Sequence, residues 1–184
     1  LALSMKTRIT GPSVGPPTLE RIRQAPKVLL HDHLDGGLRP TSIIELADEL
    51  GYRDLPTTDA AELSQWMLRG ANRKNLTLYL ETFAHTVGVM QTEAALHRVA
   101  RECAEDLAAD GVVYAEIRFA PELHTERGLS LDAVIEAVLA GFDAGSTSTD
   151  LTIRVICSAM RHQNNGLDVA QVAVRYRDHG VVAF

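Results

Sequence analysis

Four short apolar segments alternate with helical patterns, and this order constrains the fold of the chain more than any other feature. The segments are continuously apolar and rich in β-branched residues, as strands buried on both faces of a sheet are. They cover residues 28–31, 112–118, 152–158 and 180–184. Strands that alternate strictly with helices form right-handed βαβ units, so the pattern predicts an α/β fold with a parallel sheet.

Capping signals mark where several of the intervening helices should begin. Ser42-x-x-Glu45 and Asp59-x-x-Glu62 each have the form of a capping box followed by periodic apolar residues, and Thr92 is a candidate N-cap. We therefore expect helices to start at these positions in the first connection. The two later connections each carry one helical pattern, as single crossover helices do.

The first connection is much longer than the others. About 80 residues separate the first two predicted strands, against about 40 and 28 in the later connections. In a β/α barrel the loops after the strands form the catalytic face, so this excursion would cover a site at the end of the first strand. An eight-stranded barrel takes about 250 residues. Four strands in 184 residues therefore predict about the first half of a (β/α)8 barrel of the TIM type over residues 26–184, after an N-terminal tail with a possible short helix over residues 1–25.

Composition narrows the class of partner. A net charge of −6 and the lack of any cluster of Lys and Arg with aromatic residues argue against nucleic acid. No run approaches the ~20 apolar residues of a membrane span, and no signal-like segment begins the chain, so no membrane partner is expected. Cys103 and Cys157 lie far apart in apolar segments, as two reduced core thiols would. We expect a cytoplasmic protein, and the sequence does not predict its oligomeric state.

The segment His31-Asp32-His33-Leu34-Asp35-Gly36-Gly37 directly follows the first apolar run and has the layout of an active site. In a strand over residues 27–33, the two-residue period sends His31 and His33 to one face and Asp32 to the other. Two imidazoles on one face can bind one metal ion. Asp35 can reach back over the same site, and the two glycines allow the backbone to turn without a Cβ clash.

Zinc is the metal that this pattern favours. Zn²⁺ binds neutral imidazole nitrogens, and catalytic zinc sites have about three protein ligands and a water of lowered pKa that attacks an electrophilic carbon. Two histidines do not complete such a set. The missing ligands could come from His124 or His162, both near predicted strand ends, or from residues beyond Phe184, and the geometry favours the latter. A His-x-His pair taken alone also occurs as ordinary hydrogen-bonded surface residues.

Four segments resemble the adenosine deaminase family in order and spacing. Residues 27–40 (KVLLHDHLDGGLRP) match in full the family's His-x-His-Leu-Asp-Gly motif and the Pro-containing helix start after it. Similar matches occur at residues 75–83, 113–121 and 160–163. The resemblance extends over residues 26–184.

The resemblance implies a β/α barrel that carries one Zn²⁺ at the carboxyl ends of its strands and takes part in purine salvage. The implied reaction is hydrolytic deamination of adenosine and 2′-deoxyadenosine to inosine and 2′-deoxyinosine, so the implied partner is a small-molecule purine nucleoside. His31 and His33 match two zinc ligands, with His33 also beside the substrate, and Asp35 matches the carboxylate that holds the ribose 5′-hydroxyl. The implied apolar wall against the nucleoside consists of Leu76, Tyr79, Phe83 and Met160.

Competing interpretations exist for these residues. Apolar residues at helical spacing are usually core, so Leu76 and Phe83 have packing as their alternative role, and Asp35 could stabilise a turn. The resemblance implies a third zinc histidine, a glutamate that protonates the purine, a histidine that orients the hydroxide and a final aspartate on later strands, none with a counterpart in these 184 residues. We therefore expect no catalytic residue within the chain, and an isolated chain that is incomplete.

Two other functions stay open from the sequence. One is deamination of another aminopurine in the same superfamily, for which Asp35 argues against a 5′-phosphate because like charges repel. The other is a noncatalytic protein that binds metal or nucleoside. Zinc content and ammonia release from adenosine distinguish these functions.

Overall fold

Four parallel strands form one sheet in the order β1-β2-β3-β4. The computed structural model describes residues 15–72, 74 and 76–184, with residues 76–78 described in their backbone only. The strands are β1 (Lys27–His33), β2 (Val112–Phe119), β3 (Thr152–Cys157) and β4 (Val181–Ala183). The predicted α/β class and parallel sheet are confirmed, and the carboxyl ends of all four strands therefore lie at one edge.

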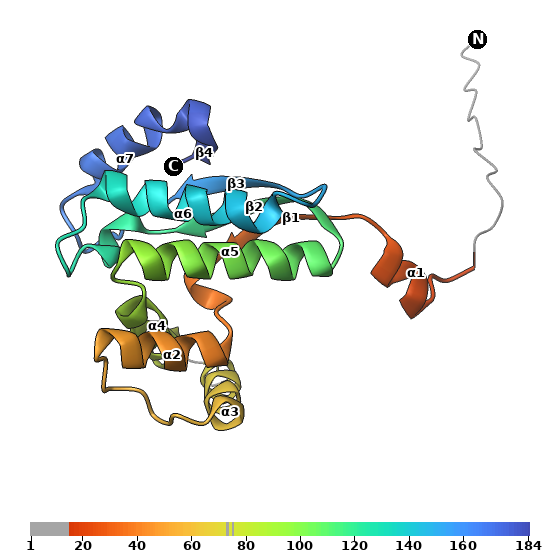
Figure 1. Cartoon of the computed structure of the whole chain (residues 1–184), viewed down its shortest axis with the longest axis horizontal. Helices are drawn as coiled ribbons and strands as arrows, with labels where there is room; N and C mark the ends of the chain where they lie inside the picture. Colours follow the sequence, from red (N-terminus) through yellow and green to blue (C-terminus); the bar gives the residue numbers. More distant parts are fainter. Residues whose placement is uncertain (1–14, 73, 75) are drawn as a thin grey trace, which may run out of the picture.

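All helices but the first fall into three groups around this sheet, and the first lies apart from it (Figure 1). Their bounds are α1 (Leu19–Gln24), α2 (Pro40–Leu50), α3 (Ala60–Ala71), α4 (Leu76–Val89), α5 (Glu93–Ala109), α6 (Leu131–Ser146) and α7 (Gly166–Arg175), with short 3₁₀ helices η1 (Leu34–Gly36), η2 (Pro121–His124) and η3 (Arg177–His179). The helices α5 and α6 pack side by side against the sheet, α7 lies near β4, and α2 to α4 form a separate group below the sheet. Within the described residues, no helix combines the length and the apolar character that a membrane crossing requires.

The core lies on the helix-covered side of the sheet. Alternate side chains of β2 are almost fully buried there, namely those of Ala115, Ile117 and Phe119. On β1, by contrast, Val28 and Leu30 are 60% and 58% exposed. On β4, Val182 is 49% exposed. The expectation that the strands are buried on both faces is therefore wrong for β1 and β4, because no described element covers these side chains. In a closed barrel such inward side chains are covered by those of the other strands.

Two of the three predicted helix starts are confirmed. The Asp59 side chain accepts a hydrogen bond from the backbone N–H of Glu62 at 2.9 Å, and Thr92 caps α5 in the same way. The third prediction is wrong, because α2 begins at Pro40 and Ser42 lies inside its first turn. Proline is well suited to the first position of a helix, where its missing N–H costs no hydrogen bond. The Ser42 hydroxyl is thereby free for a different contact.

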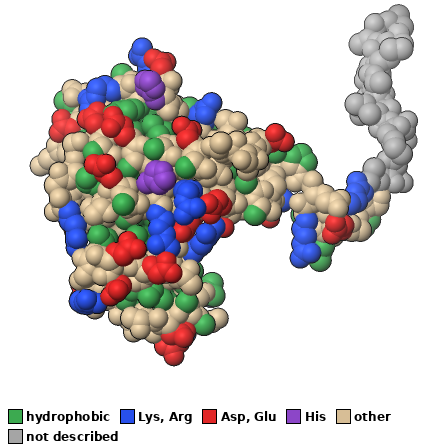
Figure 2. All heavy atoms as spheres, in the orientation of Figure 1, with side chains coloured by type: hydrophobic (Ala, Val, Ile, Leu, Met, Phe, Trp, Pro, Cys, Tyr) green, Lys and Arg blue, Asp and Glu red, His purple; other side chains and the backbone are tan. Residues whose placement is uncertain are grey.

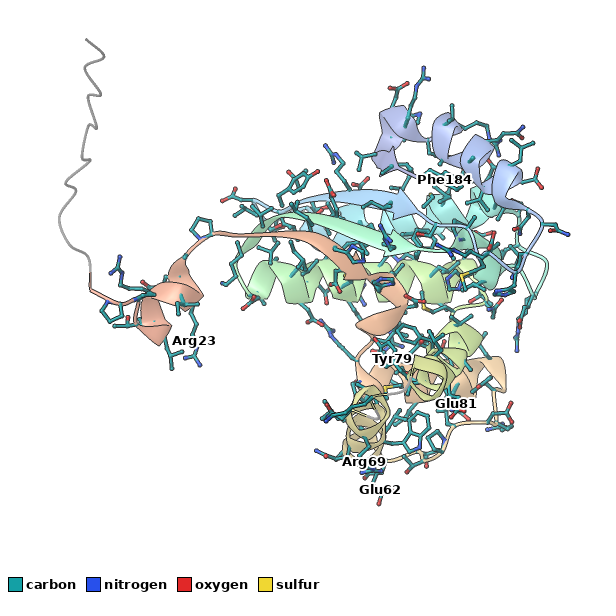
Figure 3. The ribbon with its side chains drawn as sticks, turned by 180° about the vertical axis from the view of Figure 1, so that it is seen from behind. Arg23, Glu62, Arg69, Tyr79, Glu81 and Phe184 are labelled. Carbon is teal, nitrogen blue, oxygen red and sulfur yellow. The ribbon has the colours of Figure 1, made fainter. Side chains whose placement is uncertain are left out.

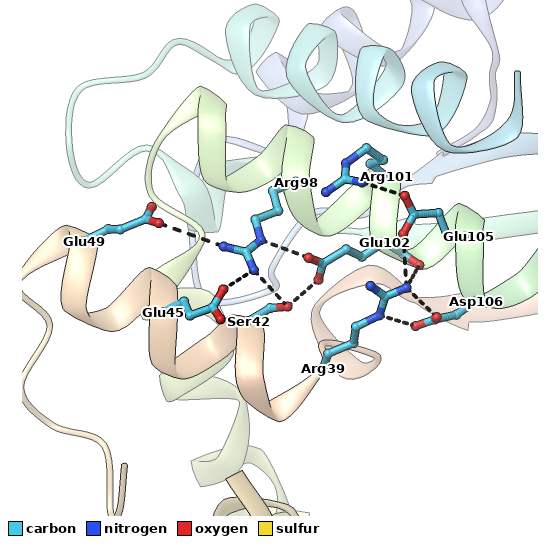
Figure 4. Close-up of polar contacts among 9 residues, drawn as sticks. All are labelled: Arg39, Ser42, Glu45, Glu49, Arg98, Arg101, Glu102, Glu105 and Asp106. Atoms are coloured by element: carbon cyan, nitrogen blue, oxygen red, sulfur yellow. Dashed lines mark hydrogen bonds and ion pairs between the residues drawn. The ribbon is translucent and has the colours of Figure 1, made fainter. Parts of the chain in front are cut away.

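That contact belongs to an ionic cluster that attaches α2 to α5 (Figure 4). The Ser42 hydroxyl donates to Glu102, and Arg98 donates to Glu102 through Nε at 2.9 Å and also to Glu45. At the start of α2, Arg39 forms a two-pronged contact with Asp106. Figure 2 shows basic and acidic side chains gathered together in the middle of this face of the molecule. The cluster thus fixes α2, the first α-helix after the histidine motif, to α5, which packs against the sheet.

Glu102 is the buried centre of this cluster, at 6% exposure. Burial alone would raise the pKa of its carboxyl group, but hydrogen bonds from Ser42 and Arg98 outweigh burial and hold that pKa below its usual value. The folded state therefore binds this proton less tightly than the unfolded state does. The stability that Glu102 contributes is present above its unfolded pKa and is lost as the pH falls through its lower, folded pKa.

Replacing Glu102 with alanine should lower the free energy of unfolding by about 2 kcal/mol at pH 7, because Ser42 and Arg98 lose a charged acceptor in a buried position. Chemical denaturation of the two proteins measures the difference, which should shrink in acid, below the ordinary pKa of a glutamate. Glu49→Ala is the matched control, since that side chain is 65% exposed and contacts Arg98 only at 3.9 Å. Equal losses from both substitutions would contradict a special role for Glu102.

Candidate active site

The end of β1 turns directly into η1, which brings the residues of the histidine motif to the carboxyl edge of the sheet. Leu34 is 1% exposed and belongs to the hydrophobic core, so the residues on either side of it are fixed in place. His33 remains exposed at the end of the strand, and Asp35 is buried at 9% exposure. A buried leucine thus separates and positions the two polar groups.

The two glycines after Asp35 do not serve the purpose that the sequence suggested. Neither Gly36 nor Gly37 has a positive φ, so the turn does not require glycine for its backbone conformation. A Cβ on Gly36 would contact His33 at 3.5 Å and Phe83 at 3.7 Å, which are ordinary distances. The expected Cβ clash is therefore absent. A longer side chain at residue 36 would instead fill space beside His33 and Phe83.

The imidazoles of His31 and His33 lie next to each other. Their ring centroids are 5.3 Å apart and their planes are inclined by 45°. The pairing of β1 with β2 has a register shift between Leu29 and Asp32, so the strand is irregular just before the second histidine. Asp32 is half-buried, and its Oδ1 accepts a hydrogen bond from the His33 backbone N–H at 2.9 Å. Both imidazole side chains are exposed.

This pair fits two positions of a zinc site. Imidazole nitrogens bound at about 2.0–2.1 Å to one tetrahedral zinc hold their ring centroids about 5 Å apart, close to the separation seen here. Within the described residues, no group of three or more His, Cys, Asp and Glu side chains is placed to hold a metal ion. His124 is fully buried and donates from Nδ1 to the Met90 carbonyl at 3.0 Å, and His162 is exposed in the turn after β3. Neither joins the pair.

A cavity of about 600 Å³ opens beside the histidine motif at the carboxyl edge of the sheet. It brings together five of the residues that the sequence selected, namely His33, Asp35, Tyr79, Phe83 and Met160. The rings of Tyr79 and Phe83 meet edge to face, with their centroids 5.2 Å apart. Figure 3 shows Tyr79 in the helical group next to the segment that follows β1. The side chain of Leu76, at the start of α4, lies outside the described residues.

One end of the cavity is polar. Asp35 Oδ1 is buried and has no hydrogen-bond partner among the described residues, with the nearest cation-forming group, His33 Nδ1, at 3.7 Å. Burial raises the pKa of the Asp35 carboxyl group, and the neighbouring His33 opposes this effect. Arg118 also lines the cavity and pairs with His33 across the sheet register. An apolar hollow with a few convergent polar groups is typical of a small-molecule site.

Several lining residues were not selected from the sequence. Arg118 and Ser158 lie at the carboxyl ends of β2 and β3, and Leu123 lies in η2. The signal that could have found the first two is their position, because in parallel sheets the residues at the ends of neighbouring strands share one edge. Leu123 had no such signal, since a short 3₁₀ helix leaves no periodic pattern in the sequence.

Solved structures with the same arrangement define the class of fold. The chain superposes on the N6-mAMP deaminase of Arabidopsis with a TM-score of 0.74 at 27% identity, covering 89% of this chain and 50% of that one. It superposes on an adenine deaminase of Arthrobacter aurescens with a TM-score of 0.69 at 26% identity, covering 84% and 46%. An amidohydrolase of Burkholderia ambifaria with bound Zn, at 23% identity and a TM-score of 0.68 over 94% and 47%, has the same fold. The four strands thus have the fold of part of a β/α barrel, as in these deaminases.

Sequence comparison narrows this class to one family. Residues 26–184 match the family model described as adenosine deaminase. The adenosine deaminase of Mycolicibacterium gilvum is 60% identical over 174 residues, and that of Mycolicibacterium vanbaalenii is 58% identical over the same length. Both alignments cover 92% of this chain and 48% of the relative, so the chain spans about half the length of these proteins. The chain belongs to the adenosine deaminase family.

The buried His124 beside the cavity gives a prediction for pH-dependent stability. Burial lowers the pKa of His124 to about 4, while its hydrogen bond to the Met90 carbonyl opposes the shift. Between pH 6.5 and 4 the unfolded chain therefore takes up a proton that the folded chain does not, and stability falls as the pH falls.

Replacing His124 with asparagine, which keeps a donor for the Met90 carbonyl, should flatten this dependence. Denaturant titrations at several pH values give the slope of the free energy of unfolding against pH. In the variant this slope should be smaller by up to about 1.4 kcal/mol per pH unit in this range. His179→Asn is the control, because His179 is exposed. An unchanged slope in His124→Asn would contradict a buried neutral imidazole.

Proposed function

We propose that the protein hydrolyses adenosine and 2′-deoxyadenosine to inosine, 2′-deoxyinosine and ammonia, as a zinc-dependent enzyme of purine salvage. The observation that carries the proposal is the paired imidazoles beside a buried carboxylate at the mouth of an apolar cavity. Membership of the adenosine deaminase family, at 60% identity to one relative of that name, supports it. A cytoplasmic location, expected from the sequence, belongs to the same proposal.

His31 and His33 are proposed to hold the metal ion from one side of the site. Their centroid separation of 5.3 Å suits two nitrogens on one tetrahedral ion. When bound, zinc would lower the pKa of a water molecule and so make available the hydroxide that hydrolysis at the purine C6 requires. An amidohydrolase structure of the same fold contains Zn. The further ligands and the proton donor are assigned to residues outside this chain.

Asp35 is proposed to orient the nucleoside through its ribose. Its Oδ1 is buried and has no hydrogen-bond partner in the part of the chain that the structure describes, which is costly unless a donor from a ligand satisfies it. A ribose 5′-hydroxyl is such a donor, whereas a 5′-phosphate would bring a second negative charge beside a buried carboxylate. The rings of Tyr79 and Phe83 and the side chain of Met160, which line the same cavity as Asp35, are proposed to cover the base. The same role for Leu76 stays a prediction.

A second candidate function is deamination of a different aminopurine. Two solved structures of the same fold are an N6-mAMP deaminase and an adenine deaminase, and structures of Arabidopsis ADAL with this fold are complexed with GMP or IMP. Arg118 is the observation that favours a nucleotide, because this residue lines the cavity and its Nε is buried without a hydrogen-bond partner among the described residues. Asp35 lies in the same cavity and favours the nucleoside.

Ammonia release from adenosine, adenine and AMP by the full-length protein tests the proposal. We expect the highest kcat/KM for adenosine and 2′-deoxyadenosine. Preference for AMP or adenine would replace the proposed substrate with the second candidate. A full-length protein that binds zinc but releases no ammonia from any of the three would establish the noncatalytic alternative.

His33→Ala should remove most of the bound zinc from the full-length protein, because one imidazole on β1 cannot replace two. Metal analysis after gel filtration measures the zinc content per chain. The control is His179→Ala, which should keep the wild-type content. Full stoichiometry in His33→Ala would defeat the assignment of this residue as a ligand.

Asp35→Ala should lower kcat/KM for adenosine by about 10- to 100-fold. This is the effect expected when a hydrogen bond to a charged group, which contributes about 1.5–3 kcal/mol, is lost. The comparison substrate is 5′-deoxyadenosine, which lacks the hydroxyl that Asp35 is proposed to bind. Steady-state kinetics should show little difference between wild type and variant on that substrate. An equal loss on both substrates would mean that Asp35 acts on something other than the ribose.

A further inference from the structure

Besides the ends of β1 and β2, three separate parts of the chain contribute apolar walls to the cavity. Phe83 and Val87 lie on α4, Leu123 lies in η2, and Met160 lies in the loop after β3. Three polar side chains behind these walls are almost completely buried. They are Gln91, which follows α4, and Glu122 and His124, which lie in η2, at 2%, 5% and 0% exposure. Buried polar groups of this kind persist when they make specific hydrogen bonds, so their partners indicate what they hold.

Two of these side chains fix η2 to the end of α4. The Gln91 amide nitrogen donates to the Val87 carbonyl at 2.9 Å and to the Leu123 carbonyl at 2.8 Å. Its amide oxygen accepts from the Glu126 backbone N–H at 3.1 Å. His124 Nδ1 donates to the Met90 carbonyl at 3.0 Å. The α4 wall and the η2 wall are therefore one connected unit.

Glu122 connects this unit to the third wall. Its Oε1 accepts a hydrogen bond from the Met160 backbone N–H, while its Oε2 is buried without a partner among the described residues. The Met160 carbonyl accepts in turn from the Gln163 N–H at 3.0 Å. The Met160 backbone is thus held on both sides, and on one of them by a carboxylate from the neighbouring strand end.

We propose that Glu122 is a positioning residue that holds Met160 against the substrate cavity and so sets how tightly the cavity closes on its ligand. This inference rests on the proposed function, because the ligand in question is the nucleoside. Glu122 itself does not line the cavity, whereas Met160 does. A hydrogen bond to a carboxylate is stronger than one between neutral groups, which suits a residue that must fix a loop.

Hydrogen exchange at the Met160 amide of the full-length protein tests this positioning without reference to activity. We expect a protected amide in the wild type, at least 10-fold faster exchange in Glu122→Ala, and near wild-type protection in Glu122→Gln, whose amide oxygen can still accept. Glu126→Ala is the matched control in the same segment, because that side chain is exposed. An unprotected amide in the wild type, or equal exchange in wild type and Glu122→Ala, would overturn the proposal.

Kinetics on adenosine tests the consequence for the substrate. Glu122→Ala should raise KM about 5- to 20-fold with kcat and zinc content nearly unchanged, and Glu122→Gln should restore KM. Met160→Ala should raise KM similarly, and the double variant should be no worse than either single one, because both act through the same side chain. Additive losses would overturn the link between Glu122 and Met160.

Two further measurements separate the possible failures. If Glu122→Ala does not fold, Glu122→Asp takes its place, since the shorter carboxylate cannot reach the Met160 N–H from the same backbone position. If the wild type does not deaminate adenosine, the proposed function fails, while the hydrogen-exchange result still decides whether Glu122 holds Met160.

Discussion

The burial of Leu34 is the constraint on which the rest of the site depends. This side chain enters the hydrophobic core between two polar neighbours, and burying a leucine is worth about 1.5–3 kcal/mol. Movement of η1 would expose it to water. The exposed imidazole of His33 and the buried carboxylate of Asp35 are therefore held 3.7 Å apart by an apolar residue that touches neither metal nor substrate in the proposed function.

Ionic contacts and hydrogen bonds to backbone groups fix the elements around η1. On one side, the charges of Arg39, Arg98 and Glu102 join α2 to α5, so the long excursion after β1 is fixed at its first helix (Figure 4). On the other side, Gln91 and Glu122 join walls of the cavity to one another through contacts to backbone groups. The ionic cluster thus fixes the helix that follows η1, and the buried polar contacts fix the lining of the cavity.

Much of the fold could be predicted from the sequence, and the exceptions have physical causes. The parallel strands followed from continuous β-branched runs, and Asp59 and Thr92 were found because a capping side chain is a local signal. Ser42 was misread because Pro40 provides an equally local start two residues earlier. The exposure of Val28 and Leu30 could not be predicted, because burial depends on what packs against a strand and not on the strand itself. In the site, the grouping of His33 with Asp35 was predicted, and the position of Arg118 near the end of β2 was a signal that could have found it. Leu123 enters the cavity only through tertiary packing.

The contacts of Gln91, Glu122 and His124 share one property, which is that their partners are main-chain atoms. Every amino acid except proline offers the same N–H and C=O groups, whatever its side chain. Substitutions at Val87, Leu123 or Met160 can therefore change the shape and chemistry of the lining while the scaffold behind it stays intact. Related proteins can therefore differ in the ligand that the cavity binds while the backbone contacts behind its lining stay the same.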